Sequence, residues 1–491
     1  MRTLKIGLAA LLAGTTLSPS LAAAPAPAST PASTATLARQ ARPNVVVILV
    51  DDLAWTDVSA NRAGTIATPN IDSIGQAGAT FSAGYVTASI CSVSRAGLLS
   101  GRIPARFGFM YNITDRGDVN HGAGLPVTVP NLAERLRPLG YATAAFGKWH
   151  QGSTRPFYPT NRGFDEYFGF LAGESIYATP DSPGLVTTPT AFDKYKPETR
   201  EGAQGLFEGP DMTPVDQPHA YLTETITEHA VDFLDRKAGG KDPFFLYVAY
   251  NAPHWPLQVP RVYFDRHSEI KDPARRTYVA MIEALDDGVG QILKTLEAKG
   301  VGKDTLIVFL SDNGCPVQFG YCTQTHPWGG GKFTYLEGGM RVPFMVVWPG
   351  HITPGQRVAT PVSSLDIVPT VLDAAAPGTP LPDELDGVDL MRTLAGTAPK
   401  VRRFFWDQRP VQALREGRYK LWRSRDWKES KLYDIEADPW ERTDLAARLP
   451  KEAARLEAEM DAFDATLPEP MWPLHSTRAI EVIGRKTEFV Y

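Results

Sequence analysis

The sequence predicts an α/β protein built on a large, mixed, mostly parallel β-sheet sandwiched by helices, followed by a smaller C-terminal α+β domain. Apolar runs of strand length alternate with helix-length segments up to about residue 394, an order that produces a mostly parallel sheet covered on both faces. Several runs are continuously apolar, which indicates strands buried on both faces. Beyond residue 394 short strands follow one another, so we expect a short antiparallel sheet with one helix.

Length and charge set broad limits on the chain. Its 491 residues allow a large α/β domain, which we place at 43–394, and a smaller domain at 395–491. A net charge of -5 gives no reason to expect nucleic acid or an anionic membrane surface as a partner.

The first residues are typical of a secretory signal peptide, which we place at 1–24. Two basic residues precede an apolar run from Ile6 to Leu17, and Ala22 to Ala24 offer a small-residue cleavage site. This run is too short for a membrane anchor, and no later segment is long enough to span a bilayer. We therefore expect an exported protein, periplasmic or secreted. Residues 25–42, rich in Pro, Ala, Ser and Thr, are predicted to be a disordered leader.

The elements of the large domain follow from apolar spacing and from residues that begin or end helices. The β-branched run at 44–50 predicts a buried strand. Thr68 and Pro69 suit the cap and first position of a helix that Gly78 can end. The other predicted strands are 80–87, 141–146, 244–250, 305–310 and 344–348, and the other helices are 94–100, 128–140, 278–296 and 365–375.

The C-terminal part and one inserted segment have their own patterns. Residues 402–406, 418–422 and 431–435 are predicted to be short antiparallel strands, and 452–467 one amphipathic helix. Residues 180–218, rich in Pro, Gly and Thr, are predicted to be a long loop, and loops of that length are often functional.

Polar residues follow four of the predicted strands directly. Because ligands bind beyond the carboxyl ends of parallel strands, we expect these residues to meet at one edge of the sheet. They are Asp51 and Asp52, Lys148 and His150, His254, and Asp312 and Asn313. The Asp and Asn residues supply only hard oxygen ligands, which favour Ca²⁺ or Mg²⁺ over zinc. The alternative is that these pairs only cap loops and turns.

The stretch from Ser89 to Arg102 centres on a cysteine at the start of a helix, where unsatisfied backbone N–H groups suit a bound anion. Arg95 lies one helical turn after Cys91 and can point toward the same place. This stretch resembles the signature of the type I sulfatases, Cys-x-Pro-x-Arg, with Ala or Ser as alternatives to Pro, followed by Leu-Thr-Gly-Arg. Val93 stands where that family has Pro, and Ser100 where it has Thr.

The resemblance extends over nearly the whole chain after the leader, with motifs in family order. They are Asp51-Asp52, the Cys91 signature, Gly147-Lys148-Trp149-His150, Ala252-Pro253-His254, Ser311-Asp312-Asn313-Gly314, Gly331-Lys332, Glu337-Gly338-Gly339-Met340-Arg341-Val342-Pro343 and Leu432-Tyr433-Asp434. The resemblance implies an alkaline phosphatase-like fold and a sulfuric ester hydrolase. Its substrate would be a sulfated carbohydrate or an aryl sulfate.

By this resemblance Cys91 becomes formylglycine through a formylglycine-generating enzyme, and its hydrate attacks sulfur and later expels sulfate. One Ca²⁺ is implied, held by Asp51, Asp52, Asp312, Asn313 and the modified side chain of residue 91. Lys148 and Lys332 stabilise the transferred sulfuryl group, and Arg95 holds the nucleophile and the carboxylates. His150 is the candidate base of the elimination, and His254 the candidate proton donor to the leaving oxygen.

The chain has three cysteines. Cys315 and Cys322 are close enough in sequence to close a small loop as a disulfide, which leaves Cys91 unpaired. Three buried, reduced thiols are the alternative, although an exported protein meets an oxidising compartment.

Two other functions fit part of the sequence. A phosphatase or phosphodiesterase on the same fold would use Ser or Thr as nucleophile and two zinc ions. A catalytically inactive protein that binds sulfated glycans would result if Val93 prevented modification of Cys91. The sequence leaves the substrate, exo or endo action and the oligomeric state open, because the leaving group meets variable segments, chiefly 152–218 and 323–328.

Overall fold

The computed structural model describes residues 42–62, 66–114, 122–190, 200–216, 219–322, 327–399, 401–475, 477–482 and 485–490. The predicted signal peptide, and the predicted leader apart from Arg42, lie outside these residues. Within the described residues no helix combines the length and the apolar character needed to cross a membrane.

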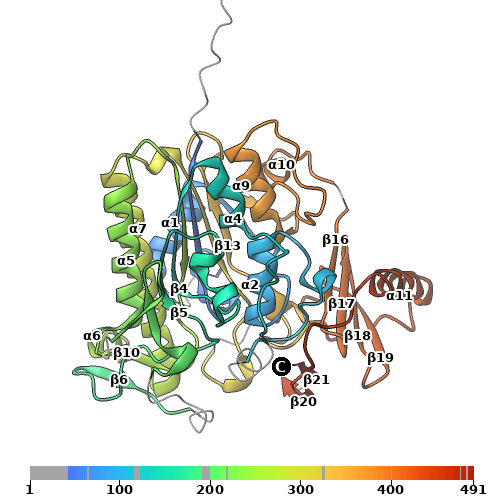
Figure 1. Ribbon diagram of the computed structural model, residues 1–491. Coiled ribbons are helices and arrows are strands. Elements are labelled where there is room, and N and C mark those ends of the chain that lie inside the picture. The colour runs from blue at the N-terminus through green and yellow to red at the C-terminus, as the bar shows by residue number, and fades with distance from the viewer. Residues whose placement is uncertain are drawn as a thin grey trace, which may run out of the picture. The chain divides into compact units, whose positions relative to one another are not determined.

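A ten-stranded sheet runs through the described part of the large domain (Figure 1). In order across the sheet the strands are β14 (Gln356–Val358), β2 (Ala79–Phe81), β13 (Phe344–Val347), β11 (Thr305–Ser311), β1 (Asn44–Val50), β9 (Phe244–Ala249), β4 (Ala142–Lys148), β5 (Glu166–Phe170), β7 (Leu206–Glu208) and β8 (Thr213–Val215). The five central strands, β11 to β5 in this order, are parallel to one another. β13 and β7 run antiparallel to their central neighbours, so the sheet is mixed and mostly parallel, as predicted.

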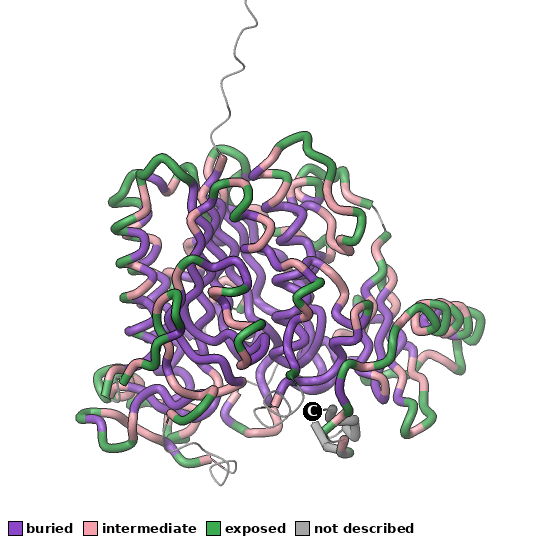
Figure 2. The backbone as a smooth tube through the Cα atoms, viewed as in Figure 1, coloured by how far each residue is buried: buried purple, intermediate pink, exposed green. Residues whose placement is uncertain are grey.

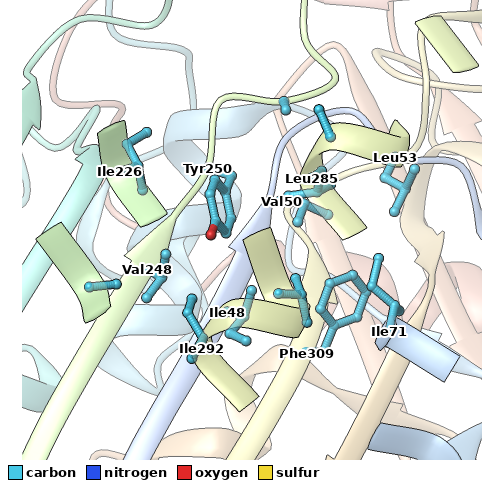
Figure 3. Close-up of a cluster of buried hydrophobic side chains, with 14 of the residues drawn as sticks. Ile48, Val50, Leu53, Ile71, Ile226, Val248, Tyr250, Leu285, Ile292 and Phe309 are labelled. Carbon is cyan, nitrogen blue, oxygen red and sulfur yellow. The ribbon is translucent and has the colours of Figure 1, made fainter. Parts of the chain in front are cut away.

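Helices cover both faces of this sheet (Figure 1). Side chains at even positions of β1 pack in one cluster with α1 (Pro69–Ala77), α5 (Leu222–Lys237) and α7 (Pro273–Ala298). Side chains at odd positions pack in a second cluster with α2 (Cys91–Ser100), α4 (Leu132–Leu136) and α9 (Ile367–Ala375). Figure 3 shows the first cluster, in which Ile48 and Val50 lie near Leu285 and Phe309. The continuously apolar sequence of β1 is therefore explained by its burial on both faces (Figure 2).

Helices α2 and α4 begin at other residues than predicted, and α1 begins as predicted but without the expected side-chain cap. α2 begins at Cys91 rather than at residue 94, because Ile90 has extended backbone and Ser94 N already donates to its carbonyl. α4 begins only at Leu132, because Asn131 and Glu134 form a capping box. The side chain of Thr68 does not cap α1 but donates to Asp72.

The C-terminal part contains a four-stranded antiparallel sheet, β16 (Arg403–Asp407), β17 (Val411–Glu416), β18 (Tyr419–Ser424) and β19 (Glu429–Asp434), with α11 (Pro450–Asp464) packed against it (Figure 1). Three of these strands were predicted and β17 was missed. The hairpin of β20 (Thr477–Val482) and β21 (Arg485–Val490) was also missed.

Shorter elements complete the fold. The predicted loop at 180–218 is wrong in part, because it contains β6 (Leu185–Thr187), β7 and β8. Residues 191–199 and 217–218 of that segment lie outside the described part. Other short elements are β3 (Gly84–Tyr85), β10 (Gln258–Pro260), β12 (Arg341–Val342), β15 (Val362–Ser363), α6 (Arg261–Asp265), α8 (Glu337–Met340) and α10 (Leu390–Leu394).

Candidate active site

The carboxyl ends of β1 and β11 bring four predicted ligands together. Asp51 and Asp52 follow β1, and Asp312 and Asn313 follow its parallel neighbour β11. Asp52 turns there with a φ of 65°, and its N–H donates to Oδ1 of Asp312 at 3.3 Å. The amide of Asn313 donates to Oδ1 of Asp52 at 2.6 Å. All four side chains are buried, so their oxygens form one enclosed cluster.

Cys91 begins α2 and lies against this cluster. Its Sγ is 3.5 Å from Oδ1 of Asp51, and the residue is 2 % exposed. Burial raises the pKa of the Cys91 thiol to about 12, and the nearby Asp51 adds to the effect. The unmodified side chain is therefore a neutral thiol at ordinary pH and not a thiolate nucleophile.

The backbone beside Cys91 is held by two side chains that sequence reasoning missed. Oδ1 of Asn112 accepts from the N–H of Ser92 at 3.2 Å and from its hydroxyl at 2.8 Å. Nε2 of Gln151 donates to the carbonyl of Ser92 at 2.8 Å. No local pattern marks either residue, because the contacts join segments 20 and 59 residues apart.

Two lysines bring positive charge to the cluster from different elements. Nζ of Lys148, at the end of β4, lies 2.6 Å from Oδ2 of Asp51. Nζ of Lys332 lies 2.8 Å from Oδ1 of Asp52. Both lysines are buried. Gly147 permits the placement of Lys148, because its φ is 109° and a Cβ there would lie 2.0 Å from the carbonyl oxygen of Ala249.

Arg95 connects the helix to the carboxylates, as its position one turn after Cys91 predicts. Its Nε donates to Oδ2 of Asp312 at 2.9 Å, and its Nη2 lies 3.4 Å from Oδ2 of Asp51. Its Nη1 donates to the carbonyl of Lys148 at 3.0 Å. One fully buried guanidinium therefore fixes three parts of the site.

The two predicted histidines differ in orientation. Nε2 of His150 lies 2.9 Å from the carbonyl oxygen of Ile113, so this nitrogen carries the proton. Its buried Nδ1 has no hydrogen-bond partner among the residues that the structure describes. Nδ1 of His254 lies 2.5 Å from the carbonyl oxygen of Trp255, and its Nε2 lies 3.6 Å from Oδ2 of Asp52. Burial lowers the pKa of His150 well below its usual value and that of His254 to about 3.

The three carboxylates of the site have different electrostatic surroundings. Burial alone raises the pKa of Asp51, but Lys148, His254 and Arg95 outweigh it and leave the pKa below its usual value. Burial raises the pKa of Asp312 to about 6, and the negative charge of Asp51 contributes. Three acidic groups packed so closely favour a bound cation.

The donor atoms suited to such a cation are grouped tightly. Among the described residues, Asp51, Asp52, Cys91 and His254 each offer one ligand atom, all within 4.8 Å of one another. Oδ1 of Asn313 is buried without a hydrogen-bond partner among the described residues, which is typical of an oxygen that coordinates a metal ion. Asp312, which the sequence also predicts as a ligand, is outside the group of four and directs Oδ2 to Arg95.

The cysteines pair as the sequence suggested. Cys315 and Cys322 form a disulfide, with Cα atoms 6.2 Å apart, and Cys91 is free and buried. The carbonyl of Cys315 accepts from the N–H of Lys332 at 3.0 Å, so the disulfide loop adjoins the site. Of the predicted substrate segment 323–328, residues 323–326 lie outside the described part.

Comparisons with known proteins agree with this geometry. A family model described as Sulfatase matches residues 43–377, and one described as N-sulphoglucosamine sulphohydrolase, C-terminal, matches 325–463. Arylsulfatase G of Rattus norvegicus is 34% identical over 413 residues, covering 78% of this chain and 76% of its own. N-acetylgalactosamine-6-sulfatase of Mus musculus is 33% identical, covering 79% and 74%.

A solved structure gives the same result for the fold. The crystal structure of Ps i-CgsB in complex with k-i-k-neocarrahexaose superposes with a TM-score of 0.79 at 32% identity, covering 88% of this chain and 95% of that one. Sequence family, relatives and fold therefore agree with the cluster around Cys91, and the chain belongs to the sulfatase family of sulfuric ester hydrolases.

Proposed function

We propose that this protein hydrolyses a sulfate monoester on a carbohydrate, using formylglycine made from Cys91 and one Ca²⁺. The observation that carries the proposal is the position of Cys91 at the first residue of α2, buried against Asp51. The ammonium groups of Lys148 and Lys332 pair with Asp51 and Asp52 beside it. Sulfated sugars are named by one curated relative, N-acetylgalactosamine-6-sulfatase. The similar structure holding k-i-k-neocarrahexaose supports a saccharide as well.

The donor set fits Ca²⁺. Asp51, Asp52, Asp312 and Asn313 would hold the ion through oxygen atoms, together with the modified side chain of residue 91, and oxygen ligands are the preference of hard cations. The unpartnered Oδ1 of Asn313 supports this assignment. When bound, the ion would offset the charge of the carboxylates and polarise the sulfate ester.

The matured side chain of residue 91 would supply two hydroxyl groups, one to attack sulfur and one to allow sulfate to be expelled. Maturation requires the formylglycine-generating enzyme to accept Val93 in place of Pro. Val93 is 2 % exposed in the folded protein and Cys91 equally so, which means that the modification has to precede folding of α2.

Lys148 and Lys332 would bind the sulfuryl oxygens. A sulfate ester develops negative charge on these oxygens and on the leaving oxygen in the transition state. Both ammonium groups are buried, and a cation shielded from water stabilises such charge more strongly than an exposed one. Arg95 would keep residue 91 and the carboxylates aligned rather than contact the substrate.

The histidines would move protons. Since Nε2 of His150 donates to Ile113, its Nδ1 lone pair is free to accept a proton during elimination of sulfate. His254 is 13% exposed in its side chain, which gives it access to the leaving oxygen at the mouth of the site. It would donate from Nε2, since Nδ1 already donates to Trp255.

Cell location and the domain boundary belong to the same proposal. The predicted signal peptide and the disulfide of Cys315 and Cys322 support export to an oxidising compartment, periplasmic or extracellular. The boundary at residues 394 and 395 stays a prediction.

The test is release of inorganic sulfate by the purified, matured protein from an aryl sulfate and from sulfated mono- and oligosaccharides, with Cys91→Ala as control. We expect release that depends on residue 91. No release from any compound, by protein shown to carry the aldehyde and Ca²⁺, would overturn the proposal. Binding of sulfated oligosaccharides by a protein whose Cys91 is never modified would favour the inactive glycan-binding function.

A further inference from the structure

α8 (Glu337–Met340) connects two parts of the active site through its backbone. The N–H of Gly338 donates to the carbonyl of Gly329 at 2.7 Å, and Gly329 lies three residues before Lys332. The carbonyl of Gly339 accepts from the N–H of Gly314 at 2.9 Å, and Gly314 directly follows Asn313. α8 therefore contacts both the turn that carries a catalytic cation and the turn that carries a candidate metal ligand.

These contacts are tight enough to transmit any displacement of α8. A Cβ on Gly314 would lie 1.9 Å from the carbonyl oxygen of Gly338. A Cβ on Gly339 would lie 2.2 Å from the carbonyl oxygen of Thr334 and 2.4 Å from that of Gly331. Because backbone meets backbone without intervening side chains, a shift of α8 has to move its neighbours.

Side chains of the C-terminal sheet region hold α8 in place. Oε2 of Glu441 accepts from the N–H of Glu337, the first residue of α8, at 2.7 Å. Nζ of Lys420, on β18, lies 3.1 Å from Oε1 of Glu337 and 2.9 Å from Oε1 of Glu441. The side chains of these three residues are completely buried.

The carboxylate of Glu337 also contacts a further cation, Arg341, and a hydroxyl, that of Tyr85. Tyr85 donates to Glu337 and accepts from Arg415, which lies opposite Lys420 in the pairing of β17 and β18. Nη1 of Arg341 lies 3.3 Å from Oε2 of Glu337. Buried ion pairs add little net stability, because desolvation offsets their attraction. The size of this network is therefore better explained by a role in positioning α8 than by a contribution to stability alone.

We propose that Lys420 and Glu441 are positioning residues for the active site. By fixing α8 they set the places of Asn313 and Lys332, so that the C-terminal sheet takes part in catalysis without contacting substrate. The inference rests on the proposed function for its turnover measurement, but it also has a readout in the affinity for Ca²⁺.

The experiment compares the full-length, matured wild type with Lys420→Met and with the double variant Lys420→Met/Glu441→Gln. The double variant removes one positive and one negative charge, and Glu337 keeps Arg341 and Tyr85 as contact partners. Calorimetry with Ca²⁺ alone gives the affinity, and hydrolysis of an aryl sulfate gives kcat and KM. We expect Ca²⁺ affinity or kcat to fall by about 10–100-fold, the usual effect of losing an outer partner of a metal ligand, with KM changed less.

The matched control is Lys431→Met on the neighbouring strand β19, whose partner Glu429 is 48% exposed in its side chain. This variant should keep wild-type values. Folded Lys420 variants with Ca²⁺ affinity and kcat within about twofold of wild type would overturn the inference, given the larger loss expected. So would failure of both variants to fold while Lys431→Met folds, since the network would then serve the fold. A wild type without turnover contradicts the proposed function instead, and the Ca²⁺ measurement still judges the positioning role.

Discussion

Nε and Nη2 of Arg95 each lie 2.9 Å from the same oxygen of Asp312, and both side chains are fully buried. Truncation by Arg95→Met leaves Asp312 without its partner, and we expect the free energy of unfolding to fall by about 3–5 kcal/mol. Urea unfolding measures this loss. Arg106→Met is the control, because the Arg106 side chain is 41% exposed in its pair with Asp386, and pairs that reach solvent contribute about 1 kcal/mol at most. Equal losses of unfolding free energy in the two variants would contradict the special role of the buried pair of Arg95 and Asp312.

His150→Asn should slow one of the two steps of the reaction and not the other. If Nδ1 of His150 is the base for elimination, attack on sulfur proceeds, and the expulsion of sulfate slows by about 10²–10⁴-fold. Rapid-mixing measurements with an aryl sulfate should show a burst of about one phenol per site, followed by slow turnover. His351→Asn, exposed and stacked on Trp348, should show wild-type kinetics. Steady slow turnover without a burst would instead assign His150 to the first step, the attack on sulfur.

Val93→Pro should increase the fraction of protein that is modified at Cys91. Val93 occupies the first turn of α2, where Ser94 N is the first N–H to bond within the helix, so Pro removes no helical hydrogen bond. Mass spectrometry of the peptide that contains Cys91 should show a loss of about 18 Da on conversion of thiol to aldehyde. Because Cys91 is buried after folding, adding the modifying enzyme to folded, unmodified protein should leave the mass unchanged. Wild-type peptide that carries only cysteine would contradict maturation.

Removal of the metal should lower both activity and stability, and Asn313→Ala should weaken its binding. A ligand at 100 times its dissociation constant stabilises the folded state by about 2.7 kcal/mol, so chelation should lower the melting temperature measurably. Ca²⁺ should restore it better than Zn²⁺, given the oxygen donors. Asn161→Ala, at an exposed turn outside the site, should leave Ca²⁺ affinity unchanged. Full recovery of activity with Zn²⁺ alone would reject the assignment of the ion.

Ionisation of Glu337 should make the free energy of unfolding depend on pH in the acidic range. Burial acts to raise the pKa of Glu337, but Lys420, Arg341 and Arg415 outweigh burial and lower it to about 2 from 4.5. Its contribution is thus fully present above about pH 4.5 and is lost as the pH falls through 2. The difference in unfolding free energy between wild type and Glu337→Gln should therefore shrink by about 2 kcal/mol between pH 6 and pH 3. Glu429→Gln, exposed on β19, should show no such trend, and a pH-independent difference for Glu337→Gln would contradict the prediction.

The sequence predicts the central sheet and its ligand edge well because both depend on local signals. Continuous apolar runs mark β1, β9 and β11, and parallel strands necessarily present their next residues at one edge. Asp51, Lys148 and Asp312 meet there as predicted. The sequence predicts the disulfide of Cys315 and Cys322 for a similar reason, since the two cysteines are only seven positions apart.

The sequence does not predict elements and residues whose positions depend on partners far away in the chain. β17 has buried Gln412 and Arg415 among apolar residues. Its sequence therefore lacks the alternation of apolar and polar residues expected of a strand with one solvent-exposed face. Lys420 and Glu441 look like ordinary surface residues in sequence. Their partner Glu337 lies 83 residues from Lys420 and 104 from Glu441, and no short-range pattern reports such a contact.

The burial of Cys91 has a consequence for the order of covalent steps during biosynthesis. Three free thiols can form three different single disulfides, whereas two can form only one. If Cys91 is converted to an aldehyde on the unfolded chain, as proposed, one thiol would be removed before the protein met an oxidising compartment. Cys315 and Cys322 would then have no competitor. Maturation of the nucleophile would thereby also guarantee correct oxidative folding, and a chain that escaped maturation would be exported with a thiol able to mispair.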